Sequence, residues 1–335
     1  MVRPAAAVGV DMGGRMGGSA PQHVRVRIPS KVNLFLRVKG RREDGYHELV
    51  TVLQTLSIHD TILAELEVAG ASAHPAARRF MELDFRIEGH DGLPLGDGNL
   101  AVRAARCLME HLGIGTRDAD GAHDVPVTRL HLTKRIPVAA GMAGGSADAA
   151  GALVALNHLW QADLDRSELR GLASALGADV PFCVGGGTAL ATGTGTATAQ
   201  VLSRGTYHWV VGISDTPLAT ADVYRAFDEV GTHSDVEPDA VLQALRTGDA
   251  EALGAALHND LEVAAIHLRP ELAAKRDALR SAGALGAVVS GSGPTVVGLA
   301  ASPQDAARIA REVAARFDRV ELAESPAGGP ELAAS

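Results

Sequence analysis

A glycine-rich run between an alternating strand pattern and an apolar helix pattern is the stretch of this sequence best suited to hold a charged ligand. The run is Val138-Ala-Ala-Gly-Met-Ala-Gly-Gly-Ser-Ala-Asp-Ala-Ala150. Gly141, Gly144 and Gly145 let the backbone turn tightly and approach a ligand, and Ser146 is a favourable N-cap. The free N–H groups of a first helical turn bind anions. We therefore expect a phosphate group, such as that of a nucleotide, at the start of this helix.

Two better-known phosphate motifs do not match the run. No Lys-Ser or Lys-Thr pair follows the glycines, as a Walker A loop requires, and the Gly-x-Gly-x-x-Gly spacing of dinucleotide sites is absent. A similar cluster, Gly13-Gly-Arg-Met-Gly-Gly-Ser-Ala20, has no strand before it and no apolar helix after it, so we interpret it as a loose tail. From the run alone, a structural turn that binds nothing remains the alternative.

Lys31 and Asp179 are the charged residues that we expect to act on a phosphoryl group. Phosphoryl transfer needs mainly positioning, a cation that gathers negative charge, and a group that accepts or orients the proton of the acceptor hydroxyl. Within hydrogen-bonding distance, an ammonium and a carboxylate each favour the charged form of the other. Because Pro181 favours extended geometry at Val180, we expect Asp179 in a tight helix-to-strand turn. The alternatives are a solvated lysine and an aspartate that only forms a turn.

The composition excludes several classes of protein. The chain has 335 residues, of which 46% are hydrophobic and 21% charged, enough for two modest domains. A net charge of −9 argues against general nucleic-acid binding. Cys107 and Cys183 suit a reducing cytoplasm, and both are expected in the core. No run reaches the roughly 18 apolar residues of a membrane span, and the N-terminus lacks the apolar region of a signal peptide.

Strands and helices follow one another without regular alternation, which predicts an α+β protein with a boundary near residue 200. Segments 69–77 and Gly115–Asp124 are interpreted as loop insertions, and a start at Met12 or Met16 stays open. The expected organisation is a disordered extension over 1–22, an N-terminal domain over 23–200, a C-terminal domain over 201–324 and a loose tail over 325–335.

Local patterns place the individual elements. Strands are expected at 23–28, 32–38, 50–57, 61–68, 129–133, 207–213, 287–290, 296–300 and 319–323. Helices are expected at 99–112, 147–160, 167–177, 221–230, 238–246, 249–261 and 270–282. Ser167 and Ser302 are expected to be N-caps, and Pro303 is expected at the first position of a last long helix.

Four motifs occur in the order seen in the GHMP kinases, a superfamily that includes galactokinase, homoserine kinase and mevalonate kinase. They are Pro29-Ser-Lys-Val-Asn-Leu-Phe-Leu36, the glycine-rich run, Gly177-Ala-Asp-Val-Pro-Phe182 and Val289-Ser-Gly-Ser-Gly-Pro-Thr295. The resemblance covers about residues 24 to 323. It implies a two-domain α+β fold with the active site in the cleft between the domains, and Lys31 and Asp179 as the catalytic pair.

The same resemblance implies ATP and Mg²⁺ as cofactors. Ser146 is a candidate magnesium ligand, because the equivalent loop serine in relatives approaches the metal. Gly291, Ser292 and Gly293 are expected to support the site without taking part in the chemistry. The residues expected to bind ATP are Pro137, Val138, Ala139, Ala140, Gly141, Met142, Ala143, Gly144, Gly145, Ser146 and Ala147.

The run Asp44-Gly-Tyr-His-Glu-Leu49 resembles a smaller group within this superfamily. It is similar to the GHMP kinases that phosphorylate 4-diphosphocytidyl-2-C-methyl-D-erythritol in the non-mevalonate isoprenoid pathway. This implies that Asn33, Tyr46 and His47 bind the substrate. Aromatic and imidazole faces stack on a base, and a neutral histidine also hydrogen-bonds its edge. Tyr207 and Tyr224 are both candidates for a ring that covers the other face of cytosine.

The resemblance therefore predicts ATP-dependent phosphorylation of a hydroxyl, expected to be the 2-hydroxyl, of that cytidine compound. The alternatives are a kinase of the homoserine or mevalonate type and a GHMP-fold sensor that binds metabolites without catalysis. The expected partner is the small-molecule substrate, with no nucleic acid and no membrane, in a cytoplasmic monomer or homodimer.

Overall fold

The computed structural model describes residues 23–43, 45–67, 80–116 and 126–333. Several expectations lie outside these residues. They are the N-terminal extension with its glycine cluster, Asp44, the insertion at 69–77 and most of the Gly115–Asp124 loop. No helix in the described part of the chain is long and apolar enough to cross a membrane.

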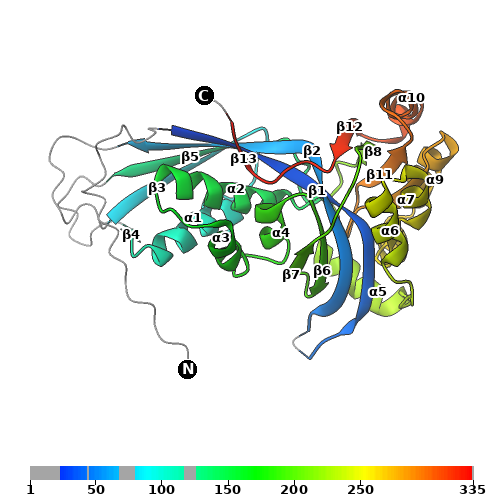
Figure 1. Cartoon of the computed structure of the whole chain (residues 1–335), viewed down its shortest axis with the longest axis horizontal. Helices are drawn as coiled ribbons and strands as arrows, with labels where there is room; N and C mark the ends of the chain where they lie inside the picture. The colour runs from blue at the N-terminus through cyan, green and yellow to red at the C-terminus, as the bar shows by residue number, and fades with distance from the viewer. Residues whose placement is uncertain (1–22, 44, 68–79, 117–125, 334–335) are drawn as a thin grey trace.

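A large mixed sheet forms the first half of the molecule, and its two longest strands run across much of the length of the protein (Figure 1). The main order among the described strands is β13-β1-β2-β5-β3-β4, with β6 and β9 added on β2 and β1, and β7 on β6. Its strands are β1 (His23–Arg41), β2 (His47–Glu67), β3 (Phe80–Glu88), β4 (Gly115–Thr116), β5 (Val127–Thr133), β6 (Thr188–Gly193), β7 (Ala197–Gln200), β9 (His258–Asn259) and β13 (Glu331–Ala333).

A smaller antiparallel sheet has the order β10-β11-β8-β12. Its strands are β8 (Tyr207–Ile213), β10 (Gly286–Val289), β11 (Val296–Ala300) and β12 (Arg319–Ser325). The helices are α1 (Leu100–His111), α2 (Gly144–Leu159), α3 (Arg166–Ala173), α4 (Val180–Gly185), α5 (Thr220–Val230), α6 (Asp239–Thr247), α7 (Ala250–Ala256), α8 (Glu262–Leu268), α9 (Glu271–Ser281), α10 (Pro303–Val313) and the short 3₁₀ helix η2 (Ala314–Arg316).

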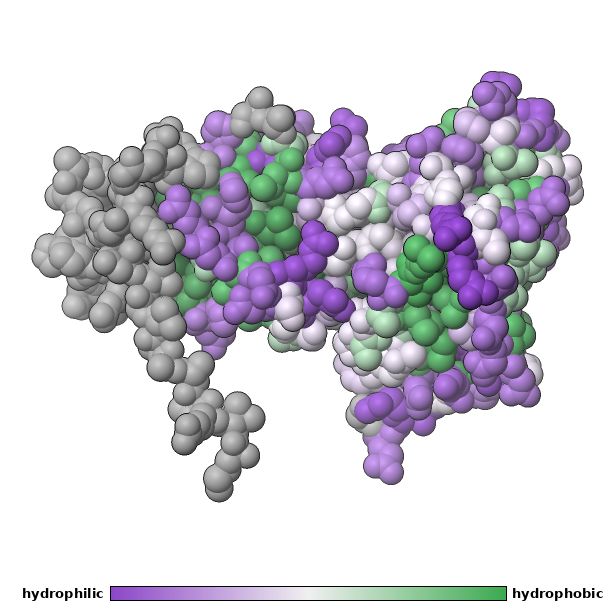
Figure 2. Space-filling model, viewed as in Figure 1, coloured by the Kyte–Doolittle hydropathy of each residue, from purple (hydrophilic) through white to green (hydrophobic). Residues whose placement is uncertain are grey.

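Helix α2 lies in the core of the first half, as its apolar sequence predicts. It packs against α1 on one side and against β1 and β2 on the other. A Cβ at Gly151 would lie 2.3 Å from Ile28 Cγ1, so only glycine lets α2 lie this close to β1. Hydrophilic residues cover most of the face in Figure 2, while hydrophobic residues gather in a few separate patches.

Most of the predicted elements are confirmed. Helix α1 begins after Asn99, which accepts a hydrogen bond from the Ala101 N–H, and α10 begins after Ser302 with Pro303 in its first turn. Strands β10 and β11 pair as an antiparallel hairpin. The expected break at Pro29-Ser-Lys is instead a shift of register between Pro29 and Ser30 within the continuous strand β1.

Four local predictions are wrong. Asp165, in a capping box with Glu168, begins α3 in place of Ser167. Val180 is the first residue of the short helix α4, because Pro181 is tolerated in a first helical turn. The expected helix at 249–261 ends at Ala256, since the chain then pairs with β1 as β9. Helix α8 was not expected.

The C-terminal segment also differs from the loose tail expected over 325–335. Ser325 ends β12, the Ala327 N–H donates to the Thr55 carbonyl over 3.1 Å, and β13 pairs with β1. The segment therefore returns from the smaller sheet to the larger one (Figure 1). The boundary near residue 200 stays a prediction. It falls between β7, in the large sheet, and β8, in the small one.

Candidate active site

A cleft of about 850 Å³ brings together segments from both halves of the chain. Its lining comes from the glycine-rich loop, β1 and the following turn, the start of α4, helix α5 and the turn between β10 and β11. All four motifs singled out in the sequence thus contribute residues to the lining. The last of them contributes Gly291 and Ser292.

The glycine-rich loop has an unusual backbone. Ala139, Gly141 and Ala143 have positive φ angles of 50°, 74° and 56°. Positive φ is uncommon for alanine and concentrates at functional sites. Turns of this kind direct backbone N–H groups into one concavity that suits an anion. No sequence pattern predicts this conformation for the two alanines, because it is normally expected of glycine or asparagine.

Ser146 is not the N-cap that the sequence predicts. Ala143, in the left-handed region, is the N-cap, and α2 begins at Gly144. The Ala147 N–H donates to the Ala143 carbonyl over 2.9 Å. By helix geometry, the amides of Gly144, Gly145 and Ser146 have no acceptor within α2. All three residues line the cleft, so these amides lie where an anion would bind.

The loop is joined to the rest of the site through its backbone. The Lys31 N–H donates to the Met142 carbonyl over 3.2 Å, and Ser290 Oγ donates to the Gly141 carbonyl over 3.2 Å. A Cβ at Gly141 would lie 2.0 Å from the Ser290 carbonyl oxygen. Glycine at 141 is therefore required for the contact between the loop and the turn after β10.

Lys31 is buried and directed at the cleft, not solvated. Its side chain is 6% exposed, and its Nζ donates to Asn33 Oδ1 over 2.6 Å. Asn33 Nδ2 in turn donates to Thr51 Oγ1, which donates to the Phe35 carbonyl. This chain of hydrogen bonds fixes the lysine on β1. Asn33 lines the cleft as predicted, but the contact that the structure shows for it is with Lys31.

Asp179 is the N-cap residue of α4, not part of a helix-to-strand turn as predicted. Its side chain makes no capping bond and is 34% exposed. Its Oδ2 lies 3.6 Å from Lys31 Nζ, which is an ion pair longer than a hydrogen bond. Burial, and next the charge of Asp179, raise the pKa of the Cys183 thiol and of the Tyr224 hydroxyl.

Aromatic rings also line the cleft. Tyr46 is 68% exposed at the rim, whereas the side chain of His47 is 8% exposed. His47 stacks on Tyr224 of α5 with centroids 4.8 Å apart, and its Nε2 lies 2.7 Å from Asp228 Oδ1. Arg41 Nη1 lies 3.7 Å from the second Asp228 oxygen. A carboxylate accepts, so Nε2 carries the proton when His47 is neutral and Nδ1 remains an acceptor.

The structure decides between the two candidate tyrosines. Tyr224 lines the cleft beside His47, whereas Tyr207 is 2% exposed on β8 and lies in the core. Neither tyrosine belongs to a local motif that would assign its ring to the cleft. The side of the helix or strand that faces the cleft is a property of the packed structure.

Seven of the eleven residues expected to bind ATP line the cleft, from Ala139 to Ala143 without Met142, and from Gly144 to Ser146. Met142 and Ala147 are buried in the core, and Pro137 and Val138 lie before the lining residues. Of the expected supporting residues, Gly291 and Ser292 line the cleft. A Cβ at Gly291 would lie 3.1 Å from Asn33 Oδ1.

Several cleft residues were missed by the sequence analysis. Arg41, Thr51, Thr220 and Asp228 all line it, and Thr220 Oγ1 lies 3.0 Å from Ser292 Oγ. Thr51 supports Asn33, and Asp228 pairs with His47 across 181 residues of sequence. None of them belongs to a local motif that identifies a ligand site.

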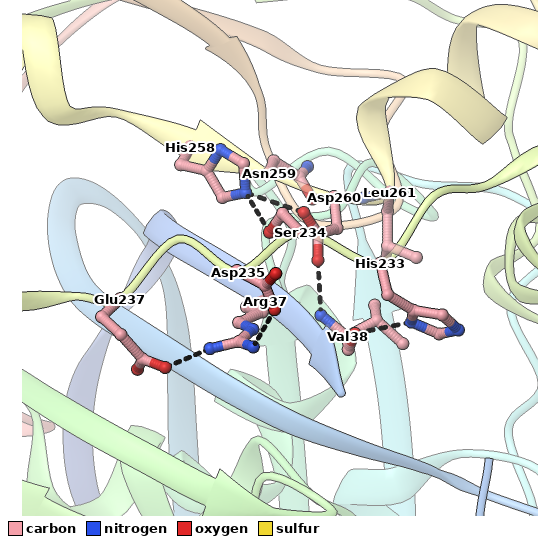
Figure 3. A network of polar contacts seen from close by, with 10 residues as sticks. All are labelled: Arg37, Val38, His233, Ser234, Asp235, Glu237, His258, Asn259, Asp260 and Leu261. Carbon is pink, nitrogen blue, oxygen red and sulfur yellow. Dashed lines mark hydrogen bonds and ion pairs between the residues drawn. The ribbon is translucent and has the colours of Figure 1, made fainter. Parts of the chain in front are cut away.

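A second polar network lies outside the cleft, where β9 and the segment before α6 meet β1 (Figure 3). Asp260 accepts hydrogen bonds from His258 and from the Val38 N–H, and Ser234 Oγ lies 3.1 Å from His258 Nε2. Both Ser234 and Asp260 use the same nitrogen of His258. A hydrolytic triad uses the two different nitrogens, so this network is not one.

Comparisons with known proteins agree with the geometry. The family description "GHMP kinases N terminal domain" matches residues 99–187, and "GHMP kinases C terminal" matches 241–319. A 4-diphosphocytidyl-2-C-methyl-D-erythritol kinase of Salinispora arenicola is 47% identical over 90% of this chain and 92% of its own length. The kinase of the same name from Mycobacterium tuberculosis is 46% identical over 84% of each chain.

Solved structures give the same result for the fold. A crystal structure of 4-(cytidine 5'-diphospho)-2C-methyl-D-erythritol kinase matches with a TM-score of 0.71 at 36% identity, covering 91% of this chain and 100% of that one. A homoserine kinase from Cytophaga hutchinsonii matches with a TM-score of 0.70 at 18% identity, covering 94% and 99%, and so shares the fold. The predicted two-domain α+β fold is confirmed, and the chain belongs to the GHMP kinase family.

Proposed function

We propose that this kinase transfers the γ-phosphoryl group of ATP to the 2-hydroxyl of 4-diphosphocytidyl-2-C-methyl-D-erythritol. The observation that carries the proposal is the set of groups that one cleft gathers. Backbone amides of the glycine-rich loop, the Lys31–Asp179 pair, and His47 with Tyr46 and Tyr224 all line it. The relatives named above, which carry that substrate in their names, support the same choice.

The glycine-rich loop would hold the phosphates of ATP. The amides of Gly144, Gly145 and Ser146 donate to phosphate oxygens, and the positive end of the α2 dipole favours their charge. Lys31, held by Asn33, donates to the oxygens of the γ-phosphoryl group as the bond to the leaving oxygen lengthens. Burial strengthens this interaction, since solvent screens it less.

Asp179 would receive the proton of the acceptor. The acceptor oxygen forms a bond to the γ-phosphorus, the bond between that phosphorus and the bridging oxygen breaks, and ADP leaves with the electron pair. The hydroxyl proton passes to the carboxylate of Asp179, which lies beside Lys31. The 3.6 Å ion pair leaves both groups able to turn toward the substrate.

His47, Tyr46 and Tyr224 would recognise cytosine. His47 Nδ1, an acceptor while Nε2 bonds Asp228, suits the exocyclic amino group of cytosine. The rings of Tyr46 and Tyr224 offer faces on which the base stacks. A different base would leave a buried acceptor unpaired, which discriminates more strongly than the loss of an apolar contact.

Mg²⁺ would enter with ATP. Among the described residues, no three His, Cys, Asp or Glu side chains are grouped as a metal site. Mg²⁺ in nucleotide sites is commonly held by phosphate oxygens, water and one or two protein oxygens. Ser146, whose side chain belongs to the cleft lining, is the protein ligand that we propose. We also infer a cytoplasmic location from the two free cysteines, Cys107 and Cys183.

The alternatives fit the site less well. Homoserine and mevalonate contain no base, so neither substrate would use the acceptor nitrogen of His47 beside aromatic rings. A sensor without catalysis has no use for Lys31 buried against a partly exposed carboxylate. The deciding experiment measures ADP release from ATP and Mg²⁺ with the cytidine compound, mevalonate or homoserine as acceptor. Turnover with the cytidine compound alone is expected. Turnover with another alcohol would overturn the substrate, and ATP binding without any turnover would favour the sensor.

A further inference from the structure

Three charged side chains form a buried cluster directly behind the glycine-rich loop. Lys134 follows β5, Asp60 is in β2 and Asp148 is in α2, and they are 7%, 0% and 3% exposed. Lys134 Nζ donates to Asp60 Oδ2 over 2.5 Å and to Asp148 Oδ2 over 2.8 Å. None of the three residues lines the cleft, so the proposed transfer chemistry does not use them.

Asp60 fixes the beginning of the loop. Its Oδ1 accepts the backbone N–H groups of Arg135 and Ile136 over 2.5 and 2.8 Å, while its Oδ2 accepts Lys134. All the neighbours bonded to this carboxylate are therefore donors. Pro137 and the loop follow at once, so the direction in which the chain enters the loop depends on Asp60.

Asp148 and Gly144 fix the end of the loop. Asp148 is the fifth residue of α2, and its bond to Lys134 ties the first turns of the helix to the same ammonium. A Cβ at Gly144 would lie 3.2 Å from Lys134 Nζ and 3.2 Å from Ile136 Cγ2. The open side of Gly144 thus faces the cluster, and Lys134 supports the residue that begins α2.

The charges of the cluster suit a place behind an anion site. Burial alone would lower the pKa of Lys134, but the two carboxylates outweigh it and the pKa is raised. Burial raises the pKa of Asp148 well above its usual range. Asp148 Oδ1 has no hydrogen-bond partner among the described residues. The buried ammonium of Lys134 offsets carboxylate charge in the cluster, which lessens the repulsion of phosphate.

We propose that Lys134 and Asp60 are positioning residues for nucleotide binding, which hold both ends of the glycine-rich loop so that the amides at the start of α2 converge on phosphate. This rests on the proposed role of the loop as the ATP phosphate site. Lys134 joins the entry of the loop, through Asp60, to its exit, through Asp148. No other side chain among those described bonds to both carboxylates.

A pair of isosteric substitutions tests the proposal. In Asp60→Asn, the new NH₂ group must face either Lys134 or the two backbone N–H groups, all of which are donors. In Asp148→Asn, the amide oxygen can still accept from Lys134 and the NH₂ can occupy the side where Oδ1 has no partner. Both changes replace a carboxyl of the same cluster by an amide of the same shape, and they differ in whether the surrounding donors still find an acceptor.

The measurement is the Kd for ATP with Mg²⁺, by isothermal titration of the full chain without acceptor. We expect Asp60→Asn to raise this Kd about tenfold or more, and Asp148→Asn to raise it at most about threefold. The KM for the acceptor should change less than the Kd for ATP in both variants. Folded Asp60→Asn protein that binds ATP like the wild type, or equal losses in both variants, would overturn the proposal.

Gly144→Ala keeps the test valid if Asp60→Asn fails to fold. The added methyl group points at Lys134 and Ile136, not into the cleft, and alanine favours helix, so stability should be retained. Weaker ATP binding without a lower Tm supports the proposal, and unchanged binding contradicts it. Because only ATP is used, wild-type protein that binds ATP but phosphorylates no cytidine compound would contradict the proposed substrate and not the role of the cluster.

Discussion

Two lysines next to the glycine-rich loop have different surroundings. Lys134 is held by two carboxylates at 2.5 and 2.8 Å, in a cluster that solvent hardly reaches. Lys31 has one short bond, to Asn33, and a carboxylate at 3.6 Å that is 34% exposed. The first lysine has its partners within the protein, whereas the second has room for a partner that arrives with the substrate.

The difference separates structural from catalytic charge. A buried cluster with short bonds keeps a backbone in place, and it is costly to break because the remaining charges are left unpaired. A loosely paired ammonium and carboxylate can still turn toward reacting atoms. The following predictions, from the largest expected effect to the smallest, test whether this contrast holds.

Asp179→Asn should have the largest effect on activity. An amide cannot accept the hydroxyl proton, so we expect kcat to fall about 100- to 10,000-fold. The Kd for ATP should stay close to that of the wild type, because Asp179 makes no contact with the glycine-rich loop amides. Stopped-assay ADP release and calorimetry measure the two quantities. Wild-type turnover in this variant would disprove the assigned base.

Lys134→Met should have the largest effect on stability. It leaves two carboxylates buried without their cation, so we expect the free energy of unfolding to fall by about 3–5 kcal/mol. Lys31→Met should cost only about 1–2 kcal/mol, chiefly for the unpaired Asn33 oxygen. Urea denaturation followed by circular dichroism measures both. Equal losses would remove the contrast between the two lysines.

Lys275→Met provides a matched control for Lys134→Met. Lys275 is a part-buried lysine in the second half of the chain whose Nζ donates to Ser214 Oγ over 2.6 Å, and it does not line the cleft. We expect a loss of about 1 kcal/mol and no change in the Kd for ATP. A change in ATP binding in this variant would show that any buried lysine affects the site indirectly.

His47→Ala should act on the acceptor and not on ATP. It removes the ring that bonds Asp228 and stacks on Tyr224, so we expect the KM for the cytidine compound to rise about 10- to 100-fold. The KM for ATP should change less than about twofold, because His47 is not among the residues proposed to bind ATP. His131→Ala, on the exposed face of β5, is the control. Equal changes in KM for both substrates would contradict the assignment of His47 to the acceptor.

Asp260 extends the comparison to a closed network outside the cleft. Burial acts to raise its pKa, but hydrogen bonds from His258, Ser234 and the Val38 N–H outweigh it, so the pKa is lowered. A depressed pKa contributes stability above the unfolded value, about 3.9, and this is lost as the pH falls through the folded value.

The wild-type free energy of unfolding should therefore fall below about pH 4, and Asp260→Asn should lessen this fall by about 1 kcal/mol. Urea titrations at several pH values between neutral and acidic give the two curves. Parallel curves for the variant and the wild type would show that Asp260 does not contribute to acid sensitivity.

The motifs of the sequence predict which segments meet at the cleft better than they predict local geometry. The four motifs lie around one cleft, yet Ser146 is not the N-cap, and Asp179 begins a helix instead of a strand. Ser146 was mispredicted because Ala143 adopts a left-handed conformation that alanine rarely takes. Asp179 was mispredicted because proline, here Pro181, is tolerated both in a first helical turn and in an extended segment. Both exceptions depend on surrounding contacts.

The sequence by itself determined the family, the order of the motifs and the types of group that the chemistry needs, because glycine, lysine and aspartate carry those properties wherever they lie. Only the tertiary structure decided that Tyr224 and not Tyr207 faces the cleft, that Asp228 meets His47, and that Lys134 supports the loop. These contacts join residues far apart in the chain. Their free energies depend on distance and burial, which no local pattern encodes.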